Sequence, residues 1–151
     1  MLFPLSDYKA MACIAYKSGY KYQLKETYVM ADAIKPDTPI NTEYIALTSD
    51  GTLTISKGYA WDGPSGPTID TLNFMRGSLI HDALYQLIRE RHLDKDKYRE
   101  IADRLLQKMC KEDGMSTLRA WLVYQGVRFG GDPSADPAND KPVIRAPKAC
   151  P

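Results

Sequence analysis

The pattern of apolar and polar residues divides the chain into a β-rich first part and a helical second part. Apolar and polar residues roughly alternate over 43–56, on both sides of the turn sequence SDG at 49–51. Alternation around an Asp-Gly turn predicts a β-hairpin. The aromatic-rich segment 20–30 predicts a further strand, and the prolines in 33–42 predict a loop between the two. We therefore expect an antiparallel β platform over residues 1–60.

Beyond residue 72, apolar residues recur three and four positions apart, which is the period of an amphipathic helix. Three helices are expected, with approximate limits 73–92, 97–111 and 116–130. Asp94 or Asp96 is expected to cap the second helix, and Gly130-Gly131 to end the third. The residues expected on the buried sides are Leu79, Ile80, Ala83, Leu84, Leu87 and Ile88, then Tyr98, Ile101, Ala102, Leu105, Leu106 and Met109, then Leu118, Trp121, Leu122 and Val127.

These elements predict an α+β protein, in which the β platform precedes a C-terminal bundle of about three helices. Residues 1–131 are expected to form one domain, with the platform at 1–60 and the loop and helices at 61–131. The remaining segment, 132–151, contains five prolines and little to bury. It predicts an extended or disordered tail.

Composition narrows the functional classes. The 151 residues are 44% hydrophobic and carry a formal net charge of +1, which gives no support for nucleic-acid binding. No run reaches about 18 apolar residues, and no charged region precedes an apolar run at the start, so neither a membrane span nor a signal peptide is expected. Cys13, Cys110 and Cys150 show no metal-ligand spacing and define no disulfide framework. A reducing compartment is therefore the simpler expectation.

A loop rich in glycine and proline joins the two parts and leads into the first helix. Its glycines, Gly58, Gly63 and Gly66, allow turns that other residues disfavour, while Pro64 and Pro67 restrict its freedom. Such a loop can aim carbonyl oxygens at one point. Calcium takes carbonyl and carboxylate oxygens, so a loop of this kind next to a helical aspartate predicts a calcium site.

The first helix carries His81, Asp82 and Tyr85. His81 and Tyr85 are four residues apart and share a face, and Asp82 and Tyr85 are three apart. Asp103 interrupts the apolar set of the second helix, where it could orient the imidazole across an antiparallel helix pair. We expect His81 to act as a general base, Asp103 to orient it, and Tyr85 to donate to the same carboxylate. Asp82 is then the carboxylate available to calcium.

At these residues the chain resembles the phospholipase A2 superfamily, whose pattern is a glycine-rich calcium loop followed by a helix bearing HDxxY. The resemblance implies a calcium-binding role for the backbone carbonyls of Trp61, Gly63 and Ser65 and for Asp82. It implies that His81, Asp103 and Tyr85 form the catalytic set, and that Asp62, Gly66 and Arg76 support the loop or the substrate. Three cysteines of secreted members are replaced here by Gly77, Ser78 and Leu84, and the connection between the two helices is shorter.

Three segments, WDGPSGPT, NFMRGSLIHDALYQL and VRFGG, resemble an uncharacterised family of tailed-phage and prophage proteins. This resemblance implies a phage-encoded protein located in the host cytoplasm or in the virion, with other virion proteins as further partners. Together the two resemblances imply a calcium-dependent lipolytic hydrolase that cleaves a phospholipid ester with water activated by histidine. Its partner would be a phospholipid membrane surface.

Alternatives remain open at each point. The protein could be a non-enzymatic tail or baseplate component that uses the HD motif structurally, or an interaction protein directed at the host. The loop could be a structural crossover, Asp103 could pair with Arg99 or Arg104, and Arg76 could anchor the loop. Zinc chemistry lacks the required ligands, because the only other histidine is His92. A thiol hydrolase that uses Cys13 or Cys110 with His81 is a further alternative.

Overall fold

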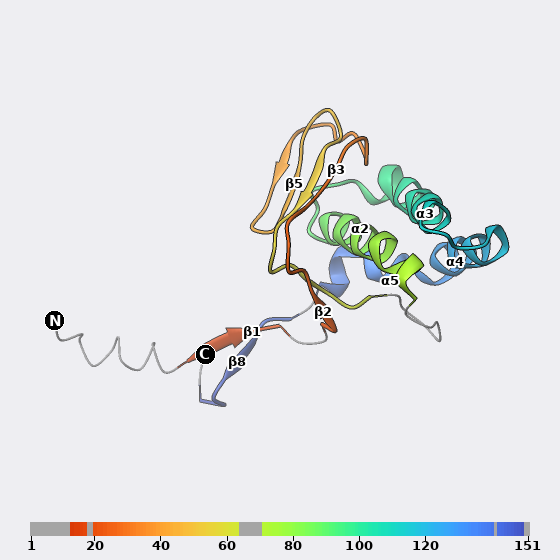
Figure 1. Ribbon diagram of the computed structural model, residues 1–151. Coiled ribbons are helices and arrows are strands. Elements are labelled where there is room, and N and C mark those ends of the chain that lie inside the picture. The colour runs from red at the N-terminus through yellow and green to blue at the C-terminus, as the bar shows by residue number, and fades with distance from the viewer. Residues whose placement is uncertain (1–12, 18–19, 64–70, 141, 150–151) are drawn as a thin grey trace. The chain divides into compact units, whose positions relative to one another are not determined.

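The computed structural model of the protein describes residues 13–17, 20–63, 71–140 and 142–149, and the chain divides into two compact units. The larger unit spans Tyr20–Asp140 and contains the platform and the helices (Figure 1). The smaller unit is made from both ends of the chain. Its described part is an antiparallel pair of strands, β1 (Ile14–Tyr16) and β8 (Ile144–Ala146).

The platform of the larger unit is a four-stranded antiparallel sheet with the strand order β3-β6-β5-β4. Its strands are β3 (Tyr28–Met30), β4 (Ile40–Asn41), β5 (Ile45–Leu47) and β6 (Leu53–Ile55). A separate antiparallel pair joins β2 (Tyr22–Gln23) to β7 (Ala60–Trp61). In β5 and in β6, the first and third residues are buried and the middle residue is partly buried. Alternate residues of each strand therefore face the core, as the pattern of the sequence predicts.

The turn between β5 and β6 shows why the hairpin forms where the sequence predicts it. Gly51 has a φ of 91°, a backbone conformation that favours glycine. Its N–H donates to the carbonyl of Thr48, and the carboxylate of Asp50 accepts from the N–H of Thr52 at 3.2 Å. The predicted antiparallel hairpin is confirmed.

Three long helices follow: α2 (Leu72–Arg89), α3 (Lys95–Glu112) and α4 (Thr117–Gly130). Asp94 caps α3 by accepting from the N–H of Lys97, and Ser116 caps α4 by accepting from the N–H of Arg119. The predicted helix limits are therefore correct to within a few residues, except that the first helix ends before His92. The protein is an α+β protein, as its pattern predicts.

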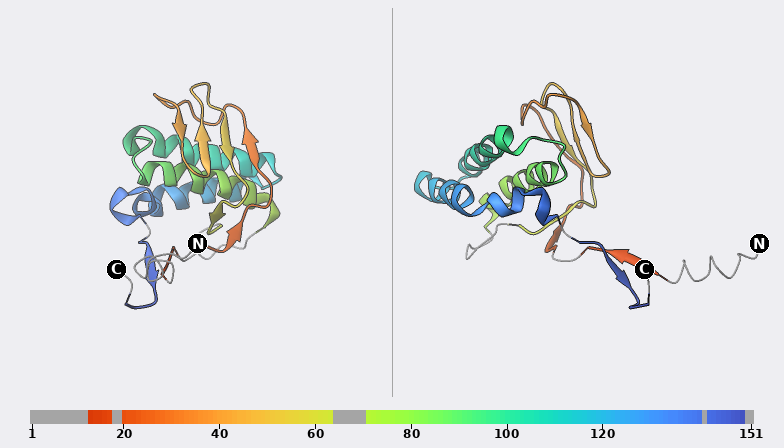
Figure 2. Two further views of the ribbon diagram at one scale, coloured as in Figure 1. Left: turned by 90° about the vertical axis from the view of Figure 1, so that its left-hand side faces the viewer. Right: turned by 180° about the vertical axis from the view of Figure 1, so that it is seen from behind.

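The sheet packs on α2, and α4 lies on the side of α2 that faces away from the sheet (Figures 1 and 2). One buried apolar cluster joins the sheet to α2 and α3, and includes Ile55, Leu79 and Met109. A second, smaller cluster joins the start of α2, the end of α3 and the inner side of α4. Its buried members are Phe74, Leu106, Cys110, Met115, Ala120 and Val123.

The predicted buried face of the third helix is wrong. Leu118, Trp121 and Leu122 are exposed, whereas Ala120 and Val123 are buried and Val127 packs partly against them. On α3, Ile101 is also exposed, although it was expected to be buried. The apolar period identified the core-facing side of α2 fully and that of α3 except at Ile101, but not that of α4, where Ala120 and Val123 make the contact.

The segment after α4 contains secondary structure where the sequence predicts an extended or disordered tail. Helix α5 (Asp132–Ala135) and the 3-10 helix η1 (Pro137–Asn139) both pack against α2. Ala135 is fully buried, and the carbonyl of Ser134 accepts from Arg89 at 2.8 Å. One buried alanine and two short turns give too weak a sequence signal to distinguish this segment from a tail.

Two further observations concern the cysteines and membrane insertion. Cys13 is disulfide-bonded, although no disulfide framework is expected from the sequence, and Cys110 is a free, buried thiol. Within the described ranges, none of the helices has the length and apolar character needed to cross a bilayer.

Candidate functional site

The side chains of His81, Tyr85 and Asp103 meet at the interface between α2 and α3. Nε2 of His81 lies 2.7 Å from Oδ1 of Asp103, and the hydroxyl of Tyr85 donates to the same oxygen at 2.6 Å. The aromatic rings of His81 and Tyr85 lie 4.0 Å apart between centroids. All three residues are buried, and Asp103 is inaccessible to solvent. The two contacts predicted for Asp103 are both present.

The antiparallel packing of α2 and α3 brings these residues together. Contacts run in opposite chain directions, from Arg76 with Asp113 at one end to Tyr85 with Arg99 at the other. At Gly77, an added Cβ would lie 3.0 Å from a methyl carbon of Leu106, which is a tight contact. A glycine at this position therefore lets the helices approach closely one turn before His81.

The donors around Asp103 fix its protonation state and that of the histidine nitrogen facing it. Oδ1 faces His81 and Tyr85, and Oδ2 accepts from the guanidinium of Arg128 at 2.8 Å. A carboxylate can accept all of these bonds only when it is ionised, so Nε2 of His81 carries the proton. In the neutral imidazole, Nδ1 then keeps a lone pair. No side chain in the described ranges hydrogen-bonds to this nitrogen.

The electrostatics agree with an ionised Asp103. Burial alone would raise the pKa of Asp103, but the hydrogen bonds from His81 and Tyr85 outweigh it and leave the pKa of this carboxyl below its usual range. Burial, followed by the hydrogen bond to Asp103, raises the pKa of Tyr85, so its hydroxyl stays protonated and can donate.

Two arginines complete the network, and sequence reasoning missed both roles. Arg128 of α4 pairs with Asp103, while Arg99 of α3 donates to the hydroxyl of Tyr85 at 3.2 Å and to the carbonyls of Val127 and Arg128 at 2.9 Å. Arg128 belongs to the VRFGG segment noted in the sequence. The structure places this arginine on the face of α4 toward α3. The two arginines tie the end of α4 to the His–Asp–Tyr cluster.

A neighbouring face of α2 contacts β7. Nε1 of Trp61 donates to the hydroxyl of Ser78 at 3.2 Å, and the hydroxyl of Tyr59 donates to Gln86 at 3.0 Å. Asp82 lies on the helix between Ser78 and Gln86. Burial is the main cause that raises the pKa of Tyr59, and the negative charge of Asp82 is the second. Because Ser78, Asp82 and Gln86 are four residues apart in turn, they lie on one face of α2.

The predicted loop residues are described in part. The side chain of Trp61 is buried with its ring against Tyr22, and its carbonyl accepts from the N–H of Lys21 at 3.2 Å. Gly63 has a φ of 76°, and an added Cβ would meet the Tyr22 ring at 2.5 Å. Asp62, between these two, is exposed and contributes to the electrostatic surroundings of Tyr20. Ser65 and Gly66 lie outside the described residues.

Arg76 lies away from the His–Asp–Tyr cluster. Its guanidinium forms a fork on Asp113 at the end of α3, at 2.9 and 2.8 Å, and donates to the hydroxyl of Tyr28 on β3 at 3.0 Å. These contacts join the sheet, α2 and α3. The structure does not bring Arg76 together with His81.

The described geometry also bears on the alternatives. Asp103 does not pair with Arg104, which binds Glu100 instead. Cys110 is a poor candidate nucleophile, because burial raises the pKa of its thiol to about 11. Over the ranges 13–17, 20–63, 71–140 and 142–149, no group of three or more His, Cys, Asp or Glu residues could hold a metal ion. A site built from backbone carbonyls would not form such a group.

Comparison with known proteins identifies a family. A family model described as "Protein of unknown function (DUF1353)" matches residues 40–127, from β4 into α4. The match includes His81, Tyr85 and Asp103 and stops one residue before Arg128. Neither the curated proteins nor the solved structures yielded a match. The family match covers more than half of the chain, which therefore belongs to the DUF1353 family.

Proposed function

We propose that the protein is a calcium-dependent lipolytic hydrolase that cleaves a phospholipid ester with water activated by His81. The observation that carries this proposal is the orientation of the imidazole. Asp103 fixes Nε2 as the protonated nitrogen, which leaves Nδ1 as a base that no described side chain occupies. The side chain of His81 is 9% exposed, so the base is screened from bulk water but not sealed.

Each member of the cluster has a definite task in this reaction. Nδ1 of His81 would take the proton of a water molecule as that water attacks the ester carbonyl. Asp103 would hold the ring and stabilise the positive charge that develops on it. Tyr85 would fix the position of Asp103 through a 2.6 Å hydrogen bond, and Arg128 would hold the second carboxylate oxygen. His81 would then return the proton to the leaving alcohol.

Calcium would be held by Asp82 and by the carbonyls of Trp61, Gly63 and Ser65. These are hard oxygen donors of the kind calcium takes, and a carbonyl such as that of Trp61, which accepts from the N–H of Lys21, has two lone pairs. Asp82 and Trp61 also face the same region, since Trp61 bonds to Ser78 one turn before Asp82. When bound, calcium would polarise the ester carbonyl and stabilise the oxyanion.

A structural role for the cluster is the second candidate, and one observation favours it. The Asp103 carboxylate accepts from α2 and from α4 while standing on α3, so it joins three helices without any chemistry. In that case the protein would be non-enzymatic, for example a tail or baseplate component. A phage or prophage setting remains a prediction under either candidate.

The deciding experiment compares two histidine variants. We expect wild-type protein to release fatty acid from bacterial phospholipid vesicles with calcium but not with chelator, and His81→Gln to release none while remaining folded. His92→Gln is the matched control, because His92 is exposed beyond the end of α2 and should keep full activity. No release by wild-type protein would support the structural candidate instead, and equal release by His81→Gln would rule out His81 as the base.

A second readout isolates the metal. Asp82→Asn should weaken calcium binding measured by calorimetry while leaving the thermal unfolding temperature of the calcium-free protein unchanged. Unchanged calcium affinity would remove Asp82 from the ligand set.

A further inference from the structure

The outer face of α4 carries an apolar stripe. Four large apolar residues on this face are exposed: Leu118 by 68%, Trp121 by 49%, Leu122 by 55% and Phe129 by 97%. Trp121 and Leu122 follow Leu118 by three and four residues, and Phe129 follows Leu122 by seven. This spacing places all four on one side of the helix, opposite the buried Ala120 and Val123. An exposed apolar stripe of this size on a helix marks a surface that contacts something else.

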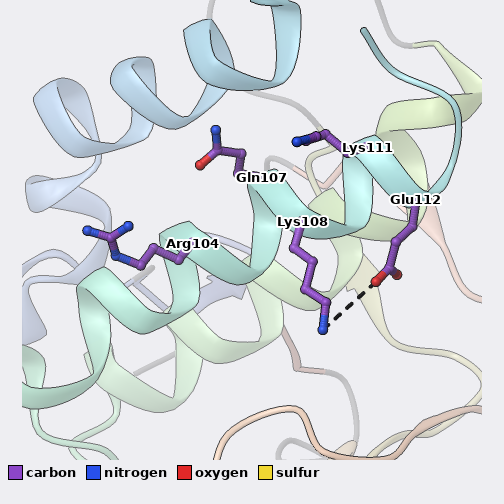
Figure 3. Close-up of a pocket in the computed structure, with 5 residues that line it drawn as sticks. All are labelled: Arg104, Gln107, Lys108, Lys111 and Glu112. Carbon is purple, nitrogen blue, oxygen red and sulfur yellow. Dashed lines mark ion pairs between the residues drawn. The ribbon is translucent and has the colours of Figure 1, made fainter. Parts of the chain in front are cut away.

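A cationic hollow lies on the solvent side of the neighbouring helix. It has a volume of about 480 Å³ and is lined by Arg104, Gln107, Lys108, Lys111 and Glu112, all from α3 (Figure 3). Three of these side chains are positive and one is negative. Arg104 is paired with Glu100 at 2.8 Å, whereas the ion pair drawn between Lys108 and Glu112 is long at 3.9 Å. Lys108 and Lys111 therefore carry most of the uncompensated positive charge of the hollow.

The stripe and the hollow adjoin. The guanidinium of Arg104, which lines the hollow, lies over the ring of Tyr124 at 5.4 Å. Tyr124 stands one turn after Trp121 on α4, so the aromatic edge of the stripe borders the cations of α3. We call the four stripe residues and the hollow together the α3–α4 face.

We infer that the α3–α4 face docks on an anionic phospholipid bilayer. Apolar side chains on a helix lying in the bilayer interface can bury among the acyl chains, and tryptophan favours the level of the head groups. The basic residues of α3 would meet lipid phosphates, with long stems that reach the interface. The combination of an apolar stripe with adjoining positive charge therefore fits a negatively charged lipid surface.

A second copy of this chain fits the face less well. In a two-fold symmetric contact through the stripe, the same surface patch is used by both copies. The two cationic hollows border that patch and would approach each other, which costs electrostatic free energy. A bilayer with anionic head groups supplies the opposite charge instead.

The inference rests on the proposed function for its purpose, since a lipolytic enzyme must hold its substrate surface. Its test does not require catalysis. Binding is measured by co-sedimentation with vesicles of phosphatidylcholine alone and of phosphatidylcholine mixed with phosphatidylglycerol, using the His81→Gln protein in chelator. We expect clear binding to the mixed vesicles, weaker binding to phosphatidylcholine, and a fall in binding as salt is raised.

Two variants locate the binding surface. Leu122→Ser combined with Phe129→Ser should weaken binding to the mixed vesicles at least about tenfold, because two side chains that would insert into the bilayer are lost. Lys108→Glu combined with Lys111→Glu should remove the preference for phosphatidylglycerol. Val29→Ser is the matched control: it changes an exposed aliphatic residue on β3 and should bind like the parent. Thermal unfolding checks that each variant is folded.

The outcomes separate the two proposals. Unchanged vesicle binding in both double variants would overturn the inference, and so would a dimer in sedimentation velocity that Leu122→Ser with Phe129→Ser dissociates. Hydrolysis of a water-soluble short-chain ester tests the catalytic proposal without a membrane. Vesicle binding without ester hydrolysis would retain the docking surface and reject the enzyme, and ester hydrolysis without vesicle binding would do the reverse.

Discussion

Among the arginine–aspartate pairs that join the helices, those made by Asp113 and by Asp103 differ in what surrounds them. Arg76 and Asp113 form a fork near the surface, where the two side chains are 34% and 23% exposed. In the pair of Arg128 with Asp103, the aspartate has no exposure at all, whereas the arginine side chain is 31% exposed. The first pair adds the hydroxyl of Tyr28 on β3, and the second adds a histidine and a tyrosine.

The difference lies in what each carboxylate can control. Asp113 faces a guanidinium, which stays charged and offers no proton chemistry at ordinary pH. Asp103 faces an imidazole and fixes which of its nitrogens carries the proton. Of these two pairs, only that of Arg128 with Asp103 therefore contacts a side chain of the kind that exchanges protons near neutral pH.

The largest expected effect comes from removing each carboxylate in turn. Asp103→Ala should lower the free energy of unfolding by about 2–6 kcal/mol, because it leaves two buried donors, the His81 ring N–H and the Tyr85 hydroxyl, without their acceptor. Asp113→Ala should cost only about 1 kcal/mol, since water can reach its site. Urea unfolding measures both values. Equal losses would mean that burial does not distinguish the two pairs.

A smaller effect tests how closely Gly131, just after α4, approaches the hydroxyl of Tyr85. An added Cβ at Gly131 would lie 2.8 Å from the hydroxyl of Tyr85 and 2.4 Å from the carbonyl of Val127. Gly131→Ala should therefore displace the end of α4 and cost about 1–3 kcal/mol. Gly130→Ala is the control, because nothing lies within 4 Å of its added Cβ. Comparable stability of the two variants in thermal unfolding would contradict this packing.

The smallest effect is a dependence on pH. The pKa of Asp103 is lowered in the folded protein, so its stabilising contribution is complete above its unfolded pKa of about 3.9 and is lost as the pH falls through the folded value. The difference in unfolding free energy between wild type and Asp103→Asn should shrink as the pH falls below about 4. A difference that grows in this acid range would have the wrong sign.

Local signals in the sequence were sufficient for the hairpin and for the existence of the helices. Gly51 and the caps Asp94 and Ser116 act through bonds to residues two to four positions away, so their effects can be read from the chain. The meeting of His81 with Asp103 needed one further assumption, that consecutive helices joined by a short loop pack antiparallel. That assumption is correct here.

Other features depended on contacts that no local pattern encodes. Arg128 looks like an ordinary helical arginine until α3 places Asp103 opposite it. The buried side of α4 is made by Ala120 and Val123, whose small side chains give a weaker signal than Trp121 and Leu122 on the outside. The same holds for Ala135, whose burial depends on α2.

The attachment of α4 has a thermodynamic consequence. This helix buries little hydrocarbon, and polar contacts hold much of it: Arg128 on Asp103, Arg99 on its last carbonyls, and Arg119 on Thr71 at 3.0 Å. Apolar hydration dominates the heat capacity of unfolding, whereas polar exposure lowers it. Local opening of α4 would expose these polar groups together with the second apolar cluster beneath the helix, so the two contributions to the heat capacity would partly cancel.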